Sequence, residues 1–116
     1  MGSEVELEPE IYDWFDTLDQ NDKETAAFYV DLLAERGVLL SEPYTRQLRG
    51  KLRELRFHLA RQSVRITYWV AGDRRIILLT VFRKQRMREE AEVQRAWRAM
   101  QRCINESHTA DEEAGS

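Results

Sequence analysis

Apolar and polar residues follow each other along the first third of the chain in patterns that predict one strand and two helices. Residues 4–8 alternate between glutamate and an apolar residue, which is the period of a short strand. Two apolar stripes at helical spacing follow, over residues 9–18 and 21–36. Asn21 is predicted to begin and cap the second helix, and Gly37 to end it.

The rest of the chain changes to the period of strands. Residues 52–57 and 64–70 alternate, and residues 76–82 are almost continuously apolar, whereas the segment 38–48 is interpreted as a connector. The alternation assigns Leu55, Phe57 and Ile66 to an apolar face and Glu54, Arg56 and Arg65 to the opposite, polar face. A last amphipathic helix is expected over residues 88–105. The order β-α-α-β-β-β-α predicts an α+β fold with a small, mainly antiparallel sheet, an N-terminal helical pair and a C-terminal helix.

The length and composition are typical of one domain. A chain of 116 residues suffices for one core, so residues 1–105 are predicted to form a single domain. Residues 106–116 are polar and acidic, and we expect this tail to be disordered. The sequence has no apolar run long enough for a membrane span, no signal-peptide pattern and a single cysteine, which together favour the cytoplasm.

The net charge of −3 is small, but the charges are unevenly distributed along the chain. Residues 1–43 hold 2 basic and 12 acidic side chains, residues 44–102 hold 16 basic and 5 acidic ones, and residues 103–116 hold 4 acidic ones. A concentrated basic surface attracts phosphate whatever the total charge is, so the middle segment points to a polyanionic partner. The alternative is an ordinary solvated surface of strand edges and a helix face.

Arginine is the residue type that the basic segment offers for chemistry. Arg56 and Arg65 fall on the polar face of adjacent predicted strands, which is expected to be exposed, and Arg83, Lys84 and Arg86 follow the last strand at one rim of the sheet. Cations held there can position an RNA phosphodiester and neutralise the charge that develops on it.

Other chemistry is poorly represented in the sequence. It contains no nucleotide-binding glycine loop, paired-cysteine zinc site, HExxH motif or nucleophile elbow, so we expect no metal and no cofactor. His58, close to Arg56, is either a general acid or base or a histidine without a catalytic role.

Three short elements follow one another in the basic segment. They consist of Leu48, Gly50, Leu52, Glu54, Leu55 and Arg56 in the first element, Arg65 and Tyr68 in the second, and Ile77, Leu78, Leu79, Phe82 and Lys84 in the third. In this order they resemble the core of the RelE/HigB-type toxin superfamily, particularly its phage-related Gp49-like branch, and the similarity extends over residues 9–102.

The resemblance implies a RelE-like fold and a bacterial type II toxin. Such a toxin is a metal-independent endoribonuclease that cuts mRNA, usually on the ribosome, through attack by the 2′-hydroxyl that leaves a 2′,3′-cyclic phosphate. The resemblance implies catalytic roles for Arg56, Arg65 and Lys84. The residues expected to bind substrate are Lys51, Arg53, His58, Arg83 and Arg86.

The sequence also departs from the family pattern. Gln85 replaces the second lysine of the third element, and no His or Tyr follows the last strand, where several relatives place a candidate base. Either His58 or a tyrosine such as Tyr68 supplies the base, or catalysis rests on electrostatics and geometry.

The resemblance further implies an antitoxin partner, for this branch often a helix-turn-helix protein, to which repression of the shared promoter would belong. The toxin alone is not expected to bind specific DNA sequences. Two alternatives are a non-enzymatic ParE-like inhibitor of DNA gyrase and an inactive binding protein of phage origin.

Overall fold

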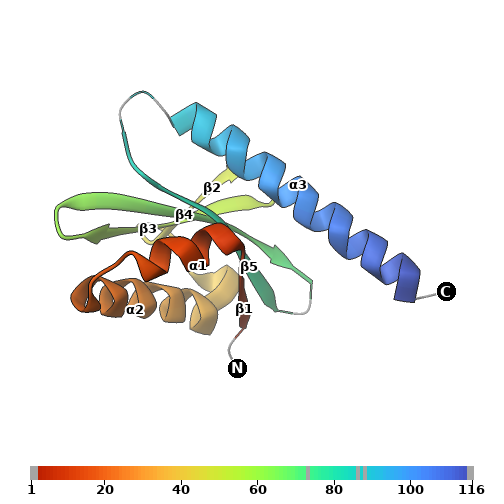
Figure 1. Cartoon of the computed structure of the whole chain (residues 1–116), viewed down its shortest axis with the longest axis horizontal. Helices are drawn as coiled ribbons and strands as arrows, with labels where there is room; N and C mark the ends of the chain where they lie inside the picture. The colour runs from red at the N-terminus through yellow and green to blue at the C-terminus, as the bar shows by residue number, and fades with distance from the viewer. Residues whose placement is uncertain (1–2, 73, 86, 88, 115–116) are drawn as a thin grey trace.

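A five-stranded sheet lies between two layers of helices (Figure 1). The computed structural model describes residues 3–72, 74–85, 87 and 89–114, with side chains as far as residue 106. The elements are, in order, β1 (Glu4–Leu7), α1 (Pro9–Asp16), α2 (Gln20–Arg36), a short 3-10 helix (Gly37–Leu39), β2 (Thr45–Arg49), β3 (Leu52–Leu59), β4 (Gln62–Ala71), β5 (Arg75–Arg83) and α3 (Glu89–Ala114). The α+β fold predicted from the sequence is confirmed.

The strand order in the sheet is β1-β5-β4-β3-β2. The strands from β2 to β5 pair antiparallel with their neighbours, as short turns between consecutive strands require. Strand β1 pairs parallel with β5, because α1 and α2 separate it from the rest of the sheet in sequence. The predicted mainly antiparallel sheet is therefore present, with one parallel edge.

Strand β2 is missing from the sequence prediction, which interpreted its residues as a connector. Its side chains are mostly polar and exposed, apart from the buried Thr45 and the half-buried Leu48. The register with β3 also shifts between Gln47 and Arg49, which breaks the period of two. An edge strand with a bulge and one aliphatic side chain lacks the pattern from which strands are predicted.

The two N-terminal helices begin and end at definable signals. Pro9 occupies the first turn of α1, where its missing N–H would have no partner. Helix α2 is capped by Asp19, whose carboxylate accepts a hydrogen bond of 2.8 Å from the N–H of Asp22, so the predicted cap at Asn21 is wrong. A carboxylate gains more than an amide at a helix N-terminus because it also interacts with the helix dipole. Gly37 ends α2 as predicted, with a φ of 53°.

Helices α1 and α2 cover the first face of the sheet, with the larger of two apolar clusters between them and the strands. Leu55 and Phe57 of β3 and Ile66 of β4 lie in this cluster with Ile11 of α1 and Leu33 of α2. Complete burial of a side chain of this size stabilises the fold by about 1.5–3 kcal/mol. The face assignments of β3 and β4 predicted from their alternation are confirmed.

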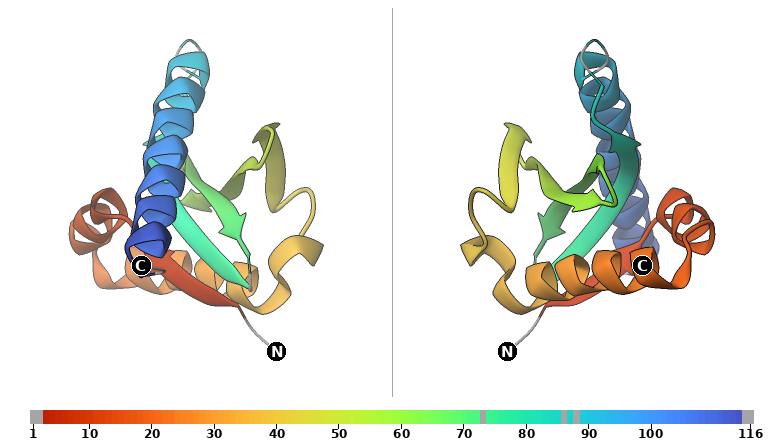
Figure 2. Two further views of the ribbon diagram at one scale, coloured as in Figure 1. Left: turned by 90° about the vertical axis from the view of Figure 1, so that its right-hand side faces the viewer. Right: turned by 90° about the vertical axis from the view of Figure 1, so that its left-hand side faces the viewer.

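Helix α3 lies over part of the opposite face, which we call the second face (Figure 2). The cluster beneath it contains Leu52, Trp69, Ala71, Ile77, Leu79, Ala96, Met100 and Cys103. The face that carries Arg56 and Arg65, which was expected to be exposed, is therefore covered in part by a helix. Trp69, Ile77 and Leu79 are large apolar side chains on that face, and they need a cover to leave water.

The last helix is also longer than predicted. The backbone of α3 is helical to Ala114, beyond the predicted end at Asn105, and Arg88, its predicted start, lies outside the described residues. Residues 106–114 contain three glutamates and two alanines, which are good helix formers. The predicted disorder of the acidic tail stays a prediction.

Candidate functional site

The register of β3, β4 and β5 brings several cationic side chains to one end of the second face. Arg56 of β3 pairs with Arg65 of β4, and His58 pairs with Ser63. The N–H of Lys84, directly after β5, donates a hydrogen bond of 2.9 Å to the carbonyl oxygen of Ser63. Because partners in a sheet point to the same side, these residues share one face over three strands.

A buried carboxylate lies next to these cations. Glu54 is fully buried, and its Oε1 lies 3.5 Å from Nε of Arg65 and 3.9 Å from Nε of Arg56. Nη1 of Arg65 donates a hydrogen bond of 2.8 Å to the hydroxyl oxygen of Ser63. Glu54 thus holds two guanidinium groups of adjacent strands close together, which their mutual repulsion would oppose.

The surroundings of Glu54 form what we call the polar half of the second face. Its members are Glu54, Arg56, Arg65, Thr67 and Thr80. The two threonine hydroxyls are buried and lie 2.6 Å apart, in hydrogen-bond contact. Polar side chains are uncommon at buried positions of a sheet unless they are paired or have a function.

The hydrogen bonds of the polar half are incomplete. Among the described residues, five buried side-chain nitrogen and oxygen atoms lack a hydrogen-bond partner, and four of them belong to Glu54, Arg56 and Arg65. Burial raises the pKa of Glu54, while the charges of Arg65 and Arg56 act in the opposite direction. Burial likewise lowers the pKa of Arg65, against the attraction of Glu54. Unsatisfied groups with shifted pKa values are frequent at functional sites.

A groove of about 330 Å³ opens beside these arginines, and we call it the cationic groove. It is lined by Tyr29, Pro43, Tyr44, Arg56, Phe57, His58 and Arg65. Two guanidinium groups and an imidazole therefore meet three aromatic rings. Three of the residues proposed for the site from the sequence, Arg56, His58 and Arg65, lie in one groove.

The position of Arg65 differs from the sequence prediction. Arg65 is only 5% exposed, although it was expected on an open sheet face. It pairs with Phe82 of β5 and with Arg56 of β3, so neighbours cover it on both sides. Arg56 is the more accessible of the two, with 26% of its side chain exposed. Strand alternation identified the face correctly but not its degree of burial.

The predicted substrate-binding residues Lys51 and Arg53 lie away from the groove. Lys51 is in the turn before β3, at the other end of this strand from His58. Arg53 donates hydrogen bonds to the hydroxyl groups of Tyr68 and Thr45, on the first face. Tyr68 is 1% exposed and in the apolar cluster, which makes it unsuited to act as a base. The alternation of β3 already separated Arg53 from Arg56.

Arg83, the residue directly before Lys84, does not share its face of the sheet. Arg83 pairs with Val64, whose side chain lies in the first-face cluster, so Arg83 leaves the sheet on that face. Arg86 lies outside the described residues. Of the two described basic residues at the end of β5, Arg83 and Lys84, the register assigns Lys84 to the second face.

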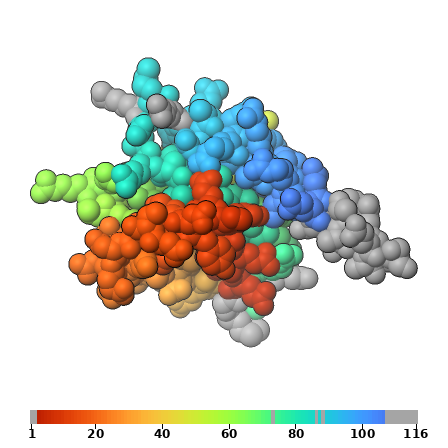
Figure 3. Space-filling view, in the orientation of Figure 1, coloured from red at the N-terminus to blue at the C-terminus, as the bar shows by residue number. Residues whose placement is uncertain are grey.

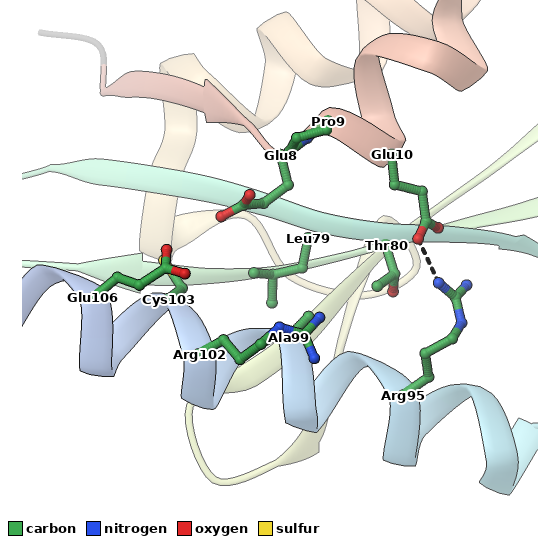
Figure 4. Close-up of a pocket in the computed structure, with 10 residues that line it drawn as sticks. All are labelled: Glu8, Pro9, Glu10, Leu79, Thr80, Arg95, Ala99, Arg102, Cys103 and Glu106. Atoms are coloured by element: carbon green, nitrogen blue, oxygen red, sulfur yellow. Dashed lines mark hydrogen bonds and ion pairs between the residues drawn. The ribbon is translucent and has the colours of Figure 1, made fainter.

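A second, smaller cavity of about 200 Å³ lies between the start of α1, β5 and α3 (Figure 4). Arg95 of α3 forms an ion pair with Glu10 of α1 and donates a hydrogen bond of 3.3 Å to the carbonyl oxygen of Val81. The carboxylate of Glu10 also accepts a hydrogen bond of 2.8 Å from the N–H of Val81. These contacts fasten α3 to the sheet, and we assign this cavity a structural role.

Within the described residues, no group of three or more His, Cys, Asp or Glu side chains is arranged to hold a metal ion. None of the helices, as far as the structure describes them, is long and apolar enough to cross a membrane.

The family described as phage-derived protein Gp49-like (DUF891) matches residues 13–103. The chain belongs to this family. No curated protein matches the Gp49-like chain.

Among solved structures, the Gp49-like chain is similar to the toxin RelE of E. coli, in a double arginine-to-alanine mutant in the free state. The TM-score is 0.60 at 16% sequence identity, and the similarity covers 88% of this chain and 98% of RelE. At this identity the structural similarity establishes the fold. Together with the family, it supports the RelE-type toxin superfamily that the sequence resembles, and hence a toxin of a toxin–antitoxin family.

The structure adds residues that the sequence interpretation of this Gp49-like chain did not place in the site. Glu54 was noted only as part of a motif, although its alternation put it on the same face as Arg56. Tyr29 and Tyr44 join the groove from α2 and from the segment before β2. No local signal connects these two tyrosines with β3, because their proximity depends on how the N-terminal helices pack.

Proposed function

We propose that the protein is the toxin of a type II toxin–antitoxin system and acts in the cytoplasm as a metal-independent endoribonuclease on mRNA at the ribosome. One observation carries this proposal. Arg56 and Arg65, on adjacent strands, line one groove while Glu54 holds their guanidinium groups together. Arrangements of this kind suit a phosphodiester, because the guanidinium fork matches two phosphate oxygens.

The first task of the groove is to hold the RNA backbone. Arg56 has the more exposed guanidinium and is suited to meet an incoming phosphate, whereas the buried Arg65 is fixed by Glu54 and Ser63. Lys84, on the same face, adds a third cation. One buried carboxylate does not neutralise three cations, so the site keeps a positive charge for its substrate.

The chemical step is an attack by the 2′-hydroxyl oxygen on the neighbouring phosphorus. A bond between O2′ and phosphorus forms, the bond from phosphorus to the 5′-oxygen of the next nucleotide breaks, and the 2′-hydroxyl proton passes to a base. The departing 5′-oxygen takes up a proton, which leaves a 2′,3′-cyclic phosphate and a 5′-hydroxyl. Guanidinium groups fixed before the reaction stabilise the additional negative charge of the transition state.

The structure favours His58 over Tyr68 as the proton-transfer group. His58 is exposed and lines the groove with Arg56, while Tyr68 is buried on the other face and bonded to Arg53. An imidazole changes its protonation near neutral pH and can both accept and return a proton. We therefore assign the role of general base to His58.

Control of such an enzyme requires an inhibitor, and the family supports an antitoxin. We propose a helix-turn-helix protein as this partner, since seven of the nine charged side chains in α1 and α2 are acidic and would repel DNA. The space-filling view shows that these two helices form much of one side of the molecule (Figure 3). DNA binding by the complex would thus come from the antitoxin.

The test is transcript 5′-end mapping in cells after induced expression of the wild type and of Arg56→Gln. The wild type should cut inside translated messages, and Arg56→Gln should remove these cuts. Arg98→Gln, an exposed arginine on α3, is the matched control and should cut like the wild type. Growth arrest with intact messages would contradict the proposal and direct attention to gyrase, and absence of both would leave an inert binding protein.

A further inference from the structure

The cationic groove has an aromatic wall that phosphate binding does not require. Tyr29 stacks on the buried Phe57 with ring centroids 5.0 Å apart and planes 11° apart. The ring of Tyr44 lies 6.5 Å from that of Tyr29, tilted by 38°. Three rings from α2, the segment before β2, and β3 thus form a row that leads from the core to the groove.

Tyr44 is the accessible end of this row. It is 41% exposed, whereas Phe57 is 3% exposed. Its backbone is fixed, because its carbonyl oxygen accepts a hydrogen bond of 2.8 Å from the N–H of Arg56 and its N–H donates one of 3.0 Å to Ser41. An exposed aromatic ring held next to an arginine is preorganised for a ligand, since little conformational entropy remains to be lost on binding.

The combination of groups indicates what the ligand is. Aromatic rings bind flat π systems, and the adjacent guanidinium groups bind phosphate. A nucleotide carries both, separated by one sugar. A base is accessible for stacking only where the nucleic acid is single-stranded, because a duplex buries the faces of its bases.

We propose that Tyr44 is a base-stacking residue, which binds the base of a single-stranded nucleotide whose phosphate is held by Arg56. This inference rests on the proposed function, and it adds the binding of a base to the contacts with the RNA backbone. Stacking tolerates every base, so the site fixes the position of the strand rather than its sequence.

A second exposed tyrosine shows that the surroundings, and not the ring alone, define this site. Tyr12 of α1 is 58% exposed and lies at an apolar pocket that also contains Asp16 and Asp31. Among the residues lining that pocket there is no Lys, Arg or His. The two carboxylates would repel a phosphate, so Tyr12 is the matched control for Tyr44.

The experiment uses the full chain and a hexanucleotide with 2′-O-methyl groups, which cannot be cleaved, with 2-aminopurine as the fluorescent base at one position. Binding is titrated at low salt. The wild type should quench the fluorescence through stacking. Tyr44→Leu, which keeps an apolar side chain against Tyr29 but has no π face, should bind about 5- to 150-fold more weakly and lose the quenching. Tyr44→Phe and the control Tyr12→Leu should behave like the wild type.

A second oligonucleotide, with an abasic site in place of the reporter base and a fluorescent label at one end, completes a double-mutant cycle. The abasic oligonucleotide should bind the wild type more weakly than the oligonucleotide with the base does. Tyr44→Leu should bind the two oligonucleotides equally well. Three results would each overturn the stacking site: equal affinities of the wild type and Tyr44→Leu, an equal loss of affinity in Tyr44→Phe and Tyr44→Leu, or no binding by the wild type.

Cleavage is measured separately. Stacking by Tyr44 in a protein that cuts no RNA would contradict the proposed function alone, and cleavage that is unaffected in Tyr44→Leu, together with unchanged binding, would contradict the stacking site alone.

Discussion

The second face of the sheet has two halves with the same strands and opposite properties. The half under α3 is apolar, with Leu52, Trp69 and Ile77 of three neighbouring strands packed against Ala96 and Met100. The polar half, farther along the same strands, has Glu54, Arg65 and two threonines at buried positions. In the described part of the chain, most unpaired buried side-chain atoms belong to this half.

This difference separates stability from function within one sheet. The apolar half gains free energy from burial, whereas the polar half pairs charges at a cost in desolvation. Under the proposed function, the buried charge cluster beside the groove serves binding rather than stability. Substitutions in the two halves should have different consequences, and the following ones test this contrast.

The largest effect is expected for Arg65→Ala, which should lose both stability and cleavage. The substitution removes the nearest partner of the buried Glu54 carboxylate, and an unpaired buried charge costs about 3–5 kcal/mol. Urea unfolding measures the loss of stability. The double variant Arg65→Ala/Glu54→Gln has no Glu54 carboxylate left without Arg65, so it should recover part of the stability but none of the cleavage. Wild-type stability of Arg65→Ala would contradict the buried ion pair.

In the apolar half, Met100→Ala should lower stability without changing the site. Met100 is 2% exposed in the cluster beneath α3, and truncation of such a side chain costs about 2–5 kcal/mol. Measured on folded protein, RNA cleavage should stay at the wild-type level. A large loss of cleavage at full folding would mean that α3 takes part in the chemistry and that the two halves are not separate.

A smaller effect concerns pH. Burial raises the pKa of Glu54 above its ordinary 4.5, so the folded state binds this proton more tightly than the unfolded state does. Stability from this group should therefore fall as the pH rises from about 4.5 through the raised folded pKa. Urea unfolding over a pH series should show this fall in the wild type and not in Glu54→Gln. Parallel curves for the two proteins would show that the Glu54 carboxyl does not titrate differently on folding.

The smallest effect is expected at the C-terminus. Deletion of residues 107–116 removes an acidic segment that follows Cys103 and Ile104, the last residues of the cluster under α3, in the sequence, so the free energy of unfolding should change by less than about 0.5 kcal/mol. Thermal unfolding of the full and shortened chains provides the comparison. A clear drop in melting temperature would show that the tail packs against the rest of the protein.

The sequence predicted the fold better than the site. Alternation in β3 and β4 assigned Leu55, Phe57 and Ile66 to one face and Arg56 and Arg65 to the other, because one face of each strand had to be buried. Strand β2 was not predicted because its mostly polar side chains do not alternate with apolar ones. Periodicity also could not show that α3 covers the second face.

The candidate site was predicted in part. Arg56, Arg65 and His58 meet in the groove, while Arg53 and Arg83 project from the other face. A count of basic residues cannot tell which of them share a face of the sheet, whereas the register of the strands can. The contribution of Tyr44 depends on contacts between segments far apart in sequence, and such contacts leave no local signal.

The central claim is that the polar half is an RNA-cutting site. The direct measurement is the rate at which purified protein forms 2′,3′-cyclic phosphate ends on mRNA bound to ribosomes, for the wild type, Arg56→Gln and Arg98→Gln. The claim predicts a rate about 10²- to 10³-fold lower for Arg56→Gln and an unchanged rate for Arg98→Gln. Equal rates for all three proteins, or no cyclic phosphate from the wild type, would contradict it.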